Sequence, residues 1–205
     1  MKKNKSSKNW IIKQHRDQYF KQAKSSGFRS RSAYKLLELN EKFKLFSNCN
    51  IVIDLGSYPG GWSQMLKRNL NNSKILSVDI KKMEKIEGVD FLCCDFQKEE
   101  SKEKILKRLN SKADLLVSDM AADTTGNKDL DCIRTNALCA EVIEFSSYVL
   151  NENGVVISKL FNGQDFLHVK KLAKNKFREV NFFKPVSSRD YSKETYIHCA
   201  GIKTL

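Results

Sequence analysis

The sequence predicts an α/β domain in which helices cover a mostly parallel sheet. Short apolar runs alternate with longer stretches of helical spacing over most of the chain, which is typical of a parallel sheet with crossover helices. The 205 residues are 40% hydrophobic, which is enough for one buried core. They include only two prolines and no internal repeat, so no linker divides the chain. We therefore expect one domain with seven strands. The expected strands are residues 51–55, 75–79, 90–94, 115–118, 155–159, 180–183 and 195–201.

The first 48 residues hold most of the positive charge. They contain 13 Lys and Arg against three acids, so they contribute +10 to the formal net charge of +13. Such a basic segment with interleaved aromatic residues predicts contact with nucleic acid through phosphates and stacked bases. We expect residues 1–30 to form a basic, partly disordered arm and 31–205 to form the single domain. The aromatic residues are Trp10, Tyr19, Phe20, Phe28 and Tyr34.

A helix is expected where this basic segment meets the sheet. Ser32 is a candidate N-cap, and Leu36, Leu37, Leu39, Phe43 and Phe46 lie near helical spacing. Later helices are expected after Gly61, Glu99, Leu130 and Gly163. The clearest of them is 133–150, which should stop at the turn NENG.

Several classes of site and location are disfavoured. No apolar run approaches the roughly 18 residues of a membrane span, and the first residues are too polar for a secretory signal. We therefore expect a cytoplasmic protein with no membrane partner. The six cysteines and three histidines lack zinc-ligand spacing, so no metal site and only free thiols are expected.

The carboxyl ends of the first three strands carry candidate cofactor residues, because ligands of open parallel sheets bind outside those ends. A Gly-rich turn, residues 56–62, follows the first strand and lets the backbone approach a ligand. It lacks both G-x-G-x-x-G and the Gly-Lys-Ser/Thr of a phosphate loop. Asp79 is placed to accept from ribose hydroxyls and Asp95 to accept from an adenine amino group. Each acid could instead cap a helix, but together they favour an adenosine-bearing cofactor such as S-adenosylmethionine.

The ends of the later strands carry candidate catalytic residues. The fourth and fifth strands run into Asp119 and Lys159. Burial would lower the pKa of the lysine and a neighbouring carboxylate would raise it, so the balance between them decides its role. The alternative is a lysine that extends to the surface at the end of the strand and has no part in a site. An antiparallel last strand would bring Glu194 to the same edge, and Lys35 could reach it from the N-terminal helix.

Five blocks in order then resemble the FtsJ/RrmJ-type ribosomal RNA large-subunit methyltransferases, from about Tyr19 to the end. The resemblance implies a Rossmann-like class I fold dependent on S-adenosylmethionine. Its sheet has seven mostly parallel strands, the last strand is antiparallel, and helices lie on both faces. The blocks are RSRSAYKLLE, VIDLGSYPGGWSQ, SDMAADTTGNKDLD, GVVISKLFNGQDF and KPVSSRDYSKETYI.

The resemblance also implies site residues and a reaction. A ribose 2′-oxygen would attack the methyl group in line, with Lys159 deprotonating or stabilising that oxygen and Asp119 positioning the lysine. Two departures stand out: Tyr58 occupies a position that is usually small, and Ala122-Asp123 replaces Pro-Asn. The implied catalytic set is Lys35, Asp119, Lys159 and Glu194, and the implied cofactor-binding set is Gly60, Trp62, Asp79, Asp95 and Asp119.

The expected substrate is a uridine in the A-loop of 23S ribosomal RNA, on the assembled 50S subunit. Transfer RNA is the alternative substrate, and a non-catalytic RNA-binding ribosome-assembly factor is the alternative class. A small-molecule methyltransferase would leave the basic first segment without a purpose. We expect a monomer.

Overall fold

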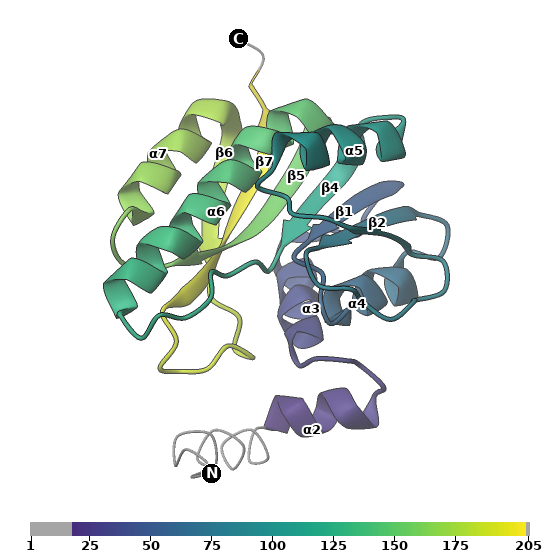
Figure 1. The fold of residues 1–205 in the computed structure, drawn as a ribbon, viewed down its shortest axis with the longest axis horizontal. Coiled ribbons are helices and arrows are strands. Elements are labelled where there is room, and N and C mark those ends of the chain that lie inside the picture. The colour runs from purple at the N-terminus through teal and green to yellow at the C-terminus, as the bar shows by residue number, and fades with distance from the viewer. Residues whose placement is uncertain (1–17, 204–205) are drawn as a thin grey trace.

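A seven-stranded sheet carries helices on both faces in the computed structural model, which describes residues 18–203 (Figure 1). The strand order is β3-β2-β1-β4-β5-β7-β6, and β7 runs antiparallel to both of its neighbours. The remaining pairs are parallel, so the expected fold class is confirmed. The strands are β1 Ile51–Leu55, β2 Lys74–Asp79, β3 Asp90–Cys93, β4 Ala113–Ser118, β5 Leu150–Phe161, β6 Phe177–Phe183 and β7 Glu194–Ile202.

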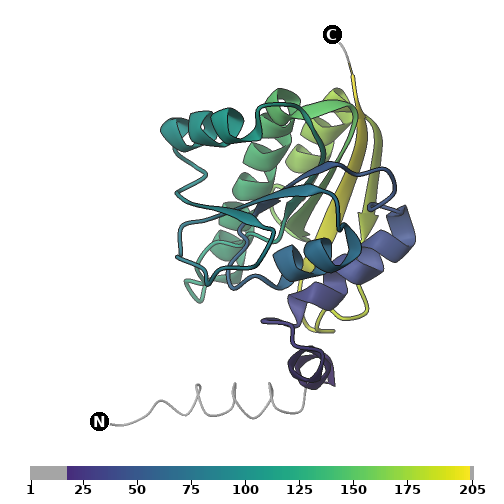
Figure 2. The same cartoon turned by 90° about the vertical axis from the view of Figure 1, so that its right-hand side faces the viewer.

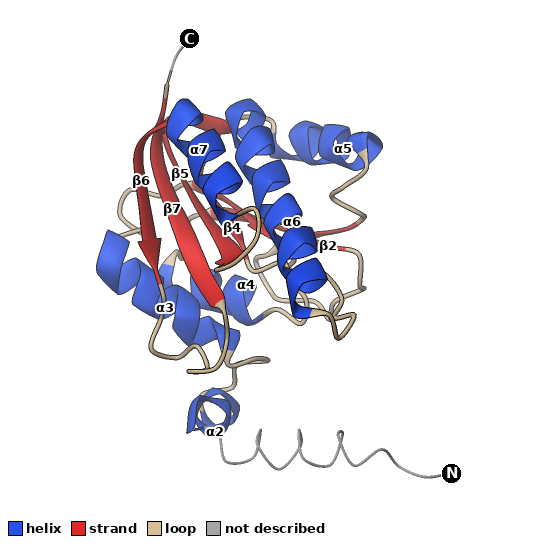
Figure 3. Ribbon diagram, turned by 90° about the vertical axis from the view of Figure 1, so that its left-hand side faces the viewer, coloured by secondary structure: helices blue, strands red, loops and turns tan. Residues whose placement is uncertain are grey.

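The helices form two layers, with α5, α6 and α7 on one face of the sheet and α3 and α4 on the other (Figures 2 and 3). The helix α2 lies away from the sheet, beyond α3. The helices are α2 Gln18–Ser25, α3 Ser32–Phe43, α4 Gly61–Asn69, α5 Glu99–Leu109, α6 Lys128–Val149 and α7 Phe166–Lys176.

Each face of the sheet has its own buried core. Phe145 and Phe177 belong to the core under α5, α6 and α7. Trp62 and Tyr196 belong to the core under α3 and α4. Because the central strands are covered on both faces, they read in the sequence as nearly continuous apolar runs.

The expected helix near the N-terminus is confirmed, but its start differs. Leu36 and Leu39 are fully buried, and the other expected apolar positions pack partly buried against the same core. Ser32 is the first helical residue and not the cap. Arg31 occupies the N-cap position in a helical conformation, and its side chain makes no capping hydrogen bond.

Two other local expectations need correction. The expected arm contains a helix, α2, which was not predicted because its eight residues are fewer than the window over which helical periodicity can be read, although Tyr19, Phe20 and Ala23 follow helical spacing. Residues 1–17, including Trp10, lie outside the described part of the chain. The NENG residues do not end α6 in a free turn. They belong to β5, which pairs through Leu150 with Ala113 before a register shift brings Val155 opposite Leu115.

The described part of the chain has neither a membrane-spanning helix nor a metal-binding cluster. None of its helices is long and apolar enough to cross a membrane. Within residues 18–203, no group of three or more His, Cys, Asp or Glu side chains is arranged to hold a metal ion. All six cysteines are free thiols.

Candidate active site

The strand register places the expected catalytic residues at one edge of the sheet. Ser118 pairs with Ser158, so Asp119 and Lys159 stand side by side one residue beyond them. Because β7 is antiparallel, its first residue Glu194 lies opposite Phe161 at the end of β5. The expectation that Glu194 would join this edge is therefore confirmed.

Four charged side chains meet there in a continuous ionic network. Lys159 Nζ lies 2.6 Å from Asp119 Oδ1 and 4.0 Å from Glu194 Oε2, and Lys35 Nζ lies 2.6 Å from Glu194 Oε1. Lys159 also donates to the main-chain oxygen of Asp119 at 2.9 Å. Lys35 comes from α3, so the helix of the basic segment does reach the strand ends from outside the sheet.

Burial and charge compete within this network, and charge prevails. Burial alone would lower the pKa of Lys159, but Asp119 and Glu194 raise it above its ordinary value. Burial would raise the pKa of Asp119 and of Glu194, yet the neighbouring lysines hold both below their ordinary values. Lys159 is therefore an ammonium at neutral pH and both acids are carboxylates, so the lysine acts as a donor and a positive charge.

A fifth side chain, Tyr196, completes the network and was missed from the sequence. Its Oη donates to Asp119 Oδ1 at 2.6 Å, and its ring lies 5.9 Å from Lys35 Nζ. Burial and the two acids raise the pKa of Tyr196 well above its ordinary value, so it remains a neutral donor. The spacing could have revealed it, because Glu194 and Tyr196 are two apart on β7 and share a face.

One face of α3 holds the connection between β6 and β7. Arg31, Lys35 and Glu38 recur at intervals of four and three residues, which places them on the same side of the helix. Glu38 accepts from the backbone N–H groups of Val186 and Ser187 at 2.5 and 2.9 Å. Arg31 donates to the carbonyl of Ser187. The connection that leads into Glu194 is therefore braced by α3 on both sides of Lys35.

A pocket of about 260 Å³ opens beside the ionic network. Burial lowers the pKa of Arg31, and the nearby charge of Arg189 lowers it further. Two guanidinium groups on one pocket make a favourable place for a phosphate. We refer to this space as the target pocket, and its lining residues are Arg31, Lys35, Arg189, Tyr191, Ser192 and Glu194.

The Gly-rich loop between β1 and α4 needs glycine at its tightest point. Gly60 has φ 114°, and an added Cβ would come within 2.9 Å of Ile86 Cδ1 and 3.0 Å of Arg29 Nη1. Trp62 follows in the first turn of α4, but its indole is buried and donates to the carbonyl of Ser32 at 2.7 Å. Any cofactor contact of Trp62 therefore falls to its backbone, since the side chain belongs to the core.

The expected ribose and adenine acids lie on neighbouring strands next to this loop. Asp79 accepts from the backbone N–H groups of Tyr58 and Lys81 at 2.9 and 2.7 Å, which ties the end of β2 to the loop. Asp95 accepts from the backbone N–H of Gln97 at 3.1 Å and does not cap α5. The structure places both acids at the carboxyl edge of the sheet, apart from the ionic network.

Arg29 joins the Gly-rich loop to the segment after β2 and was not predicted. Its guanidinium donates to the carbonyls of Pro59, Glu84 and Lys85 at 3.3, 2.7 and 3.0 Å. Its backbone N–H donates to Gln64 Oε1 at 2.8 Å. This arginine of the RSRSAYKLLE block therefore positions the loop, whereas Arg31 faces the target pocket.

Comparison with known proteins shows the family to which the chain belongs. The family model for FtsJ-like methyltransferases matches residues 28–202. The ribosomal RNA large subunit methyltransferase E of Pelagibacter ubique is 49% identical over 199 residues, which cover 97% of this chain and 98% of that protein. The protein of the same name from Rickettsia akari is 46% identical, over 94% of this chain and 87% of its own. The chain belongs to the FtsJ-like methyltransferase family.

Solved structures agree with this assignment. A Plasmodium falciparum protein described as a ribosomal RNA methyltransferase is 31% identical and has a TM-score of 0.76, over 85% of this chain and 98% of its own. A methyltransferase fold from Streptococcus mutans, solved in complex with SAH, has a TM-score of 0.54 at 13% identity, which is a likeness of fold alone. The Rossmann-like methyltransferase fold expected from the sequence is thus confirmed.

In this FtsJ-like chain, a buried carboxyl beside the Gly-rich loop has spare bonding capacity. Asp54 Oδ2 accepts from Ser63 Oγ at 2.6 Å, whereas Asp54 Oδ1 and Ser57 Oγ are buried polar atoms without a partner among the described residues. Burial, helped by the nearby charges of Asp119 and Asp79, raises the pKa of Asp54 to about 7, although the hydrogen bond from Ser63 acts in the opposite direction. Free acceptors, the N–H groups of the first turn of α4 and the acid Asp79 suit a ligand with an ammonium, a carboxylate and a ribose. These residues fit S-adenosylmethionine.

The two departures from the family pattern lie at the surface. Tyr58 is 50% exposed, and Lys81 Nζ lies 5.6 Å from the centroid of its ring. Its backbone keeps the contact with Asp79, so the larger side chain alters the rim of the loop and not its anchor. Asp123 is exposed, and its main-chain oxygen accepts from Arg134 at 3.2 Å.

Proposed function

We propose that this protein transfers a methyl group from S-adenosylmethionine to the ribose 2′-hydroxyl of a uridine in the A-loop of large-subunit ribosomal RNA, on the assembled large subunit. The observation that carries the proposal is the buried network of Lys35, Asp119, Lys159 and Glu194 next to a pocket with two arginines. The names of the relatives support ribosomal RNA as the substrate. A large-subunit substrate makes the cytoplasm the expected place of action, and the expected active form is a monomer.

The proposed cofactor site uses residues around the Gly-rich loop. Gly60 and the backbone of Trp62 would hold the amino-acid end, Asp79 the ribose, and Asp95 the adenine, with Asp119 between cofactor and target. When bound, S-adenosylmethionine supplies an electrophilic methyl group. The solved relative of this fold that contains SAH supports the cofactor class.

The residues of the network would position the hydroxyl and take up its proton. Lys159 is held as an ammonium by Asp119, so its Nζ donates a hydrogen bond to the 2′-oxygen and fixes the direction of attack. Asp119, which also accepts from Tyr196, prevents the lysine from rotating away. As the oxygen–carbon bond formed and the sulfur–carbon bond of the methyl donor broke, the oxygen would become strongly acidic, and Glu194 or solvent would accept its proton. General acid–base assistance of this kind is worth about 10²- to 10⁴-fold.

Domain roles follow from the same arrangement. Residues 31–205 would form the catalytic domain and residues 1–30 a basic RNA-binding arm. The family match begins at residue 28, close to that boundary. Within the arm, the helix α2 approaches the domain through Tyr19, whose ring lies 5.7 Å from that of Tyr34.

The decisive experiment offers labelled S-adenosylmethionine with two RNA sources in parallel. One is purified large ribosomal subunits from an unmethylated strain and the other is total transfer RNA, and the modified nucleotide is then mapped. Label on an A-loop uridine is the expected result. Label only in transfer RNA would keep the chemistry and replace the substrate, whereas cofactor binding without transfer to either would favour an assembly factor.

A further inference from the structure

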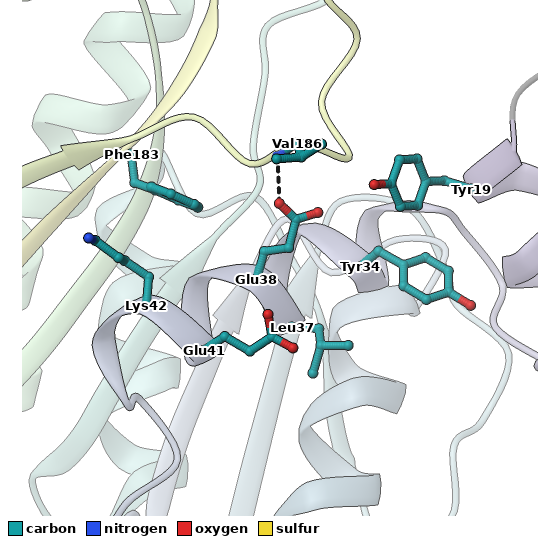
Figure 4. A pocket seen from close by; sticks show the side chains of 8 residues that line it. All are labelled: Tyr19, Tyr34, Leu37, Glu38, Glu41, Lys42, Phe183 and Val186. Carbon is teal, nitrogen blue, oxygen red and sulfur yellow. Dashed lines mark hydrogen bonds between the residues drawn. The ribbon is translucent and has the colours of Figure 1, made fainter.

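A second groove lies next to the target pocket. It measures about 540 Å³ and is bordered by α2, α3 and the connection between β6 and β7 (Figure 4). The rings of Tyr19 and Tyr34 are 5.7 Å apart and inclined at 49°, and Val186 on the opposite wall is 78% exposed. The groove is lined by Tyr19, Tyr34, Leu37, Glu38, Glu41, Lys42, Phe183 and Val186.

Arg31 connects this groove with the target pocket. It lines the target pocket, and its Cζ lies 5.7 Å from the centroid of the Tyr19 ring in the groove. The same helix, α3, supplies Lys35 to the one space and Glu38 to the other. An RNA strand that leaves the target pocket past Arg31 therefore arrives at the groove.

The charges in the groove are nearly balanced. Glu38 directs both carboxylate oxygens at the backbone N–H groups of Val186 and Ser187, so its charge is matched by backbone donors. Glu41 is exposed beside Lys42 on α3. Aromatic walls without a dominant charge suit a neutral planar ligand better than a phosphate or a lysine-rich peptide.

The hydrogen-bonding groups narrow the ligand to one chemical class. A carboxylate accepts hydrogen bonds, and unpaired bases offer it their amino groups and the ring N–H groups of guanine and uracil. Unpaired bases are recognised by stacking on tyrosine rings together with such edge contacts. Cytosine, guanine and adenine carry an amino group, whereas the one N–H on the edge of uracil lies between two carbonyl oxygens, which a carboxylate repels.

We propose that the groove of Tyr19, Tyr34 and Glu41 is a second nucleobase subsite, which takes an unpaired, amino-bearing base that flanks the methylated nucleotide. This inference rests on the proposed function, because the base belongs to the same RNA. The base stacks against the tyrosine pair and donates to Glu41, while Arg31 spans the backbone between the two sites.

The first test measures methyl transfer to large subunits from an unmethylated strain. Tyr34→Ala is expected to raise KM by about 5- to 100-fold, because loss of a stacking platform weakens binding, and to leave kcat unchanged. Glu41→Gln, at an exposed position that does not threaten folding, is expected to raise KM severalfold. Matched controls are Tyr148→Ala on α6 and Glu100→Gln on α5, both exposed on the other side of the sheet. Values of KM for both groove variants that equal those of the controls would overturn the proposal.

The second test does not depend on catalysis. Tyrosine ring resonances are followed by NMR during titration with CMP, GMP, AMP and UMP, and Tyr19→Phe and Tyr34→Phe assign the two groove tyrosines. Saturable shifts with the amino-bearing nucleotides, weaker with UMP and reduced in Glu41→Gln, are expected. Shifts with UMP as large as those with the other nucleotides would overturn the proposal. Shifts with tetralysine but with none of the nucleotides would also overturn it, because they would mark a surface for docking a protein. If wild-type protein transfers no methyl group to any RNA, the proposed function fails, but these titrations still show whether the groove binds amino-bearing bases.

Discussion

Lys159 and Asp119 form a buried ion pair with a distance of 2.6 Å between Nζ and Oδ1, and the same ammonium donates to the backbone oxygen of Asp119 at 2.9 Å. The lysine is thus held twice by one residue. Since Asp119 also accepts from Tyr196, its side chain is fixed from the β7 side as well. The pair therefore presents a positioned positive charge at the strand ends, where a hydroxyl can be oriented without movement of the protein.

Replacing the lysine should remove transfer and keep the cofactor. Lys159→Met preserves much of the side-chain volume and deletes the charge, so we expect methyl transfer to fall by at least about 10³-fold. The affinity for S-adenosylhomocysteine, measured by calorimetry, should stay within about threefold. Lys107→Met, at an exposed lysine of α5, is the control. Retained turnover in Lys159→Met would exclude the proposed role.

Removing the hydroxyl of Tyr196 should loosen the pair without deleting it. Tyr196→Phe deletes the 2.6 Å hydrogen bond to Asp119, and we expect kcat to fall by about tenfold with KM nearly unchanged. A loss of about 1–2 kcal/mol in unfolding free energy should accompany it, because a buried carboxylate oxygen loses one of its two donors and keeps only Lys159. Urea unfolding and steady-state kinetics measure the two effects. Tyr148→Phe, at an exposed tyrosine, should change neither, and a Tyr196→Phe enzyme with normal kcat would make this hydroxyl purely structural.

The two arginines of the RSRSAYKLLE block should have different functions, Arg29 in cofactor binding and Arg31 in RNA binding. Arg29→Ala deletes three bonds to carbonyls around the Gly-rich loop, so we expect weaker binding of S-adenosylhomocysteine by roughly tenfold and an unchanged salt dependence of RNA binding. Arg31→Ala should do the reverse, lowering the slope of log K against log salt by about one phosphate contact. Calorimetry and filter binding at several salt concentrations test both. An equal loss of salt dependence in Arg29→Ala would show that its guanidinium contacts RNA instead.

Sequence patterns predicted what depends on local spacing. The strands were readable because burial on both faces makes them continuous apolar runs. Asp119 was readable because a charged residue directly after such a run must stand at the edge of the sheet. Lys159 was readable because it is the one charged residue of the apolar run 155–161, although it lies two residues before β5 ends at Phe161. Glu194 needed one added assumption, an antiparallel β7, which the structure confirms.

The remaining contacts depend on how distant segments pack. The bond between Arg29 and the carbonyl of Glu84 joins residues 55 apart, and that between Glu38 and Val186 joins residues 148 apart. No periodicity encodes such pairs, because backbone carbonyl and N–H partners are the same for every residue type. The burial of the Trp62 indole was equally hidden, since an aromatic residue after a Gly-rich loop suits a ligand contact and a core contact alike.

The pH dependence of stability should reveal the buried carboxyl of Asp54. Its pKa is about 7 in the folded protein against an ordinary value of 3.8, so the folded state binds a proton more tightly than the unfolded state. Stability from this group is therefore greatest below about pH 4 and declines as the pH rises towards 7.

Asp54→Asn keeps the bond with Ser63 and cannot titrate. We expect the difference in unfolding free energy between Asp54→Asn and the original protein to grow with pH between about 4 and 7, by up to roughly 4 kcal/mol. The other acids cancel in this difference, because Asp119 and Glu194, whose pKa values are lowered, are present in both proteins. Urea titrations at intervals of one pH unit measure it. A difference that does not vary with pH would mean that the carboxyl is ionised throughout and that its unpaired oxygen has a partner such as water.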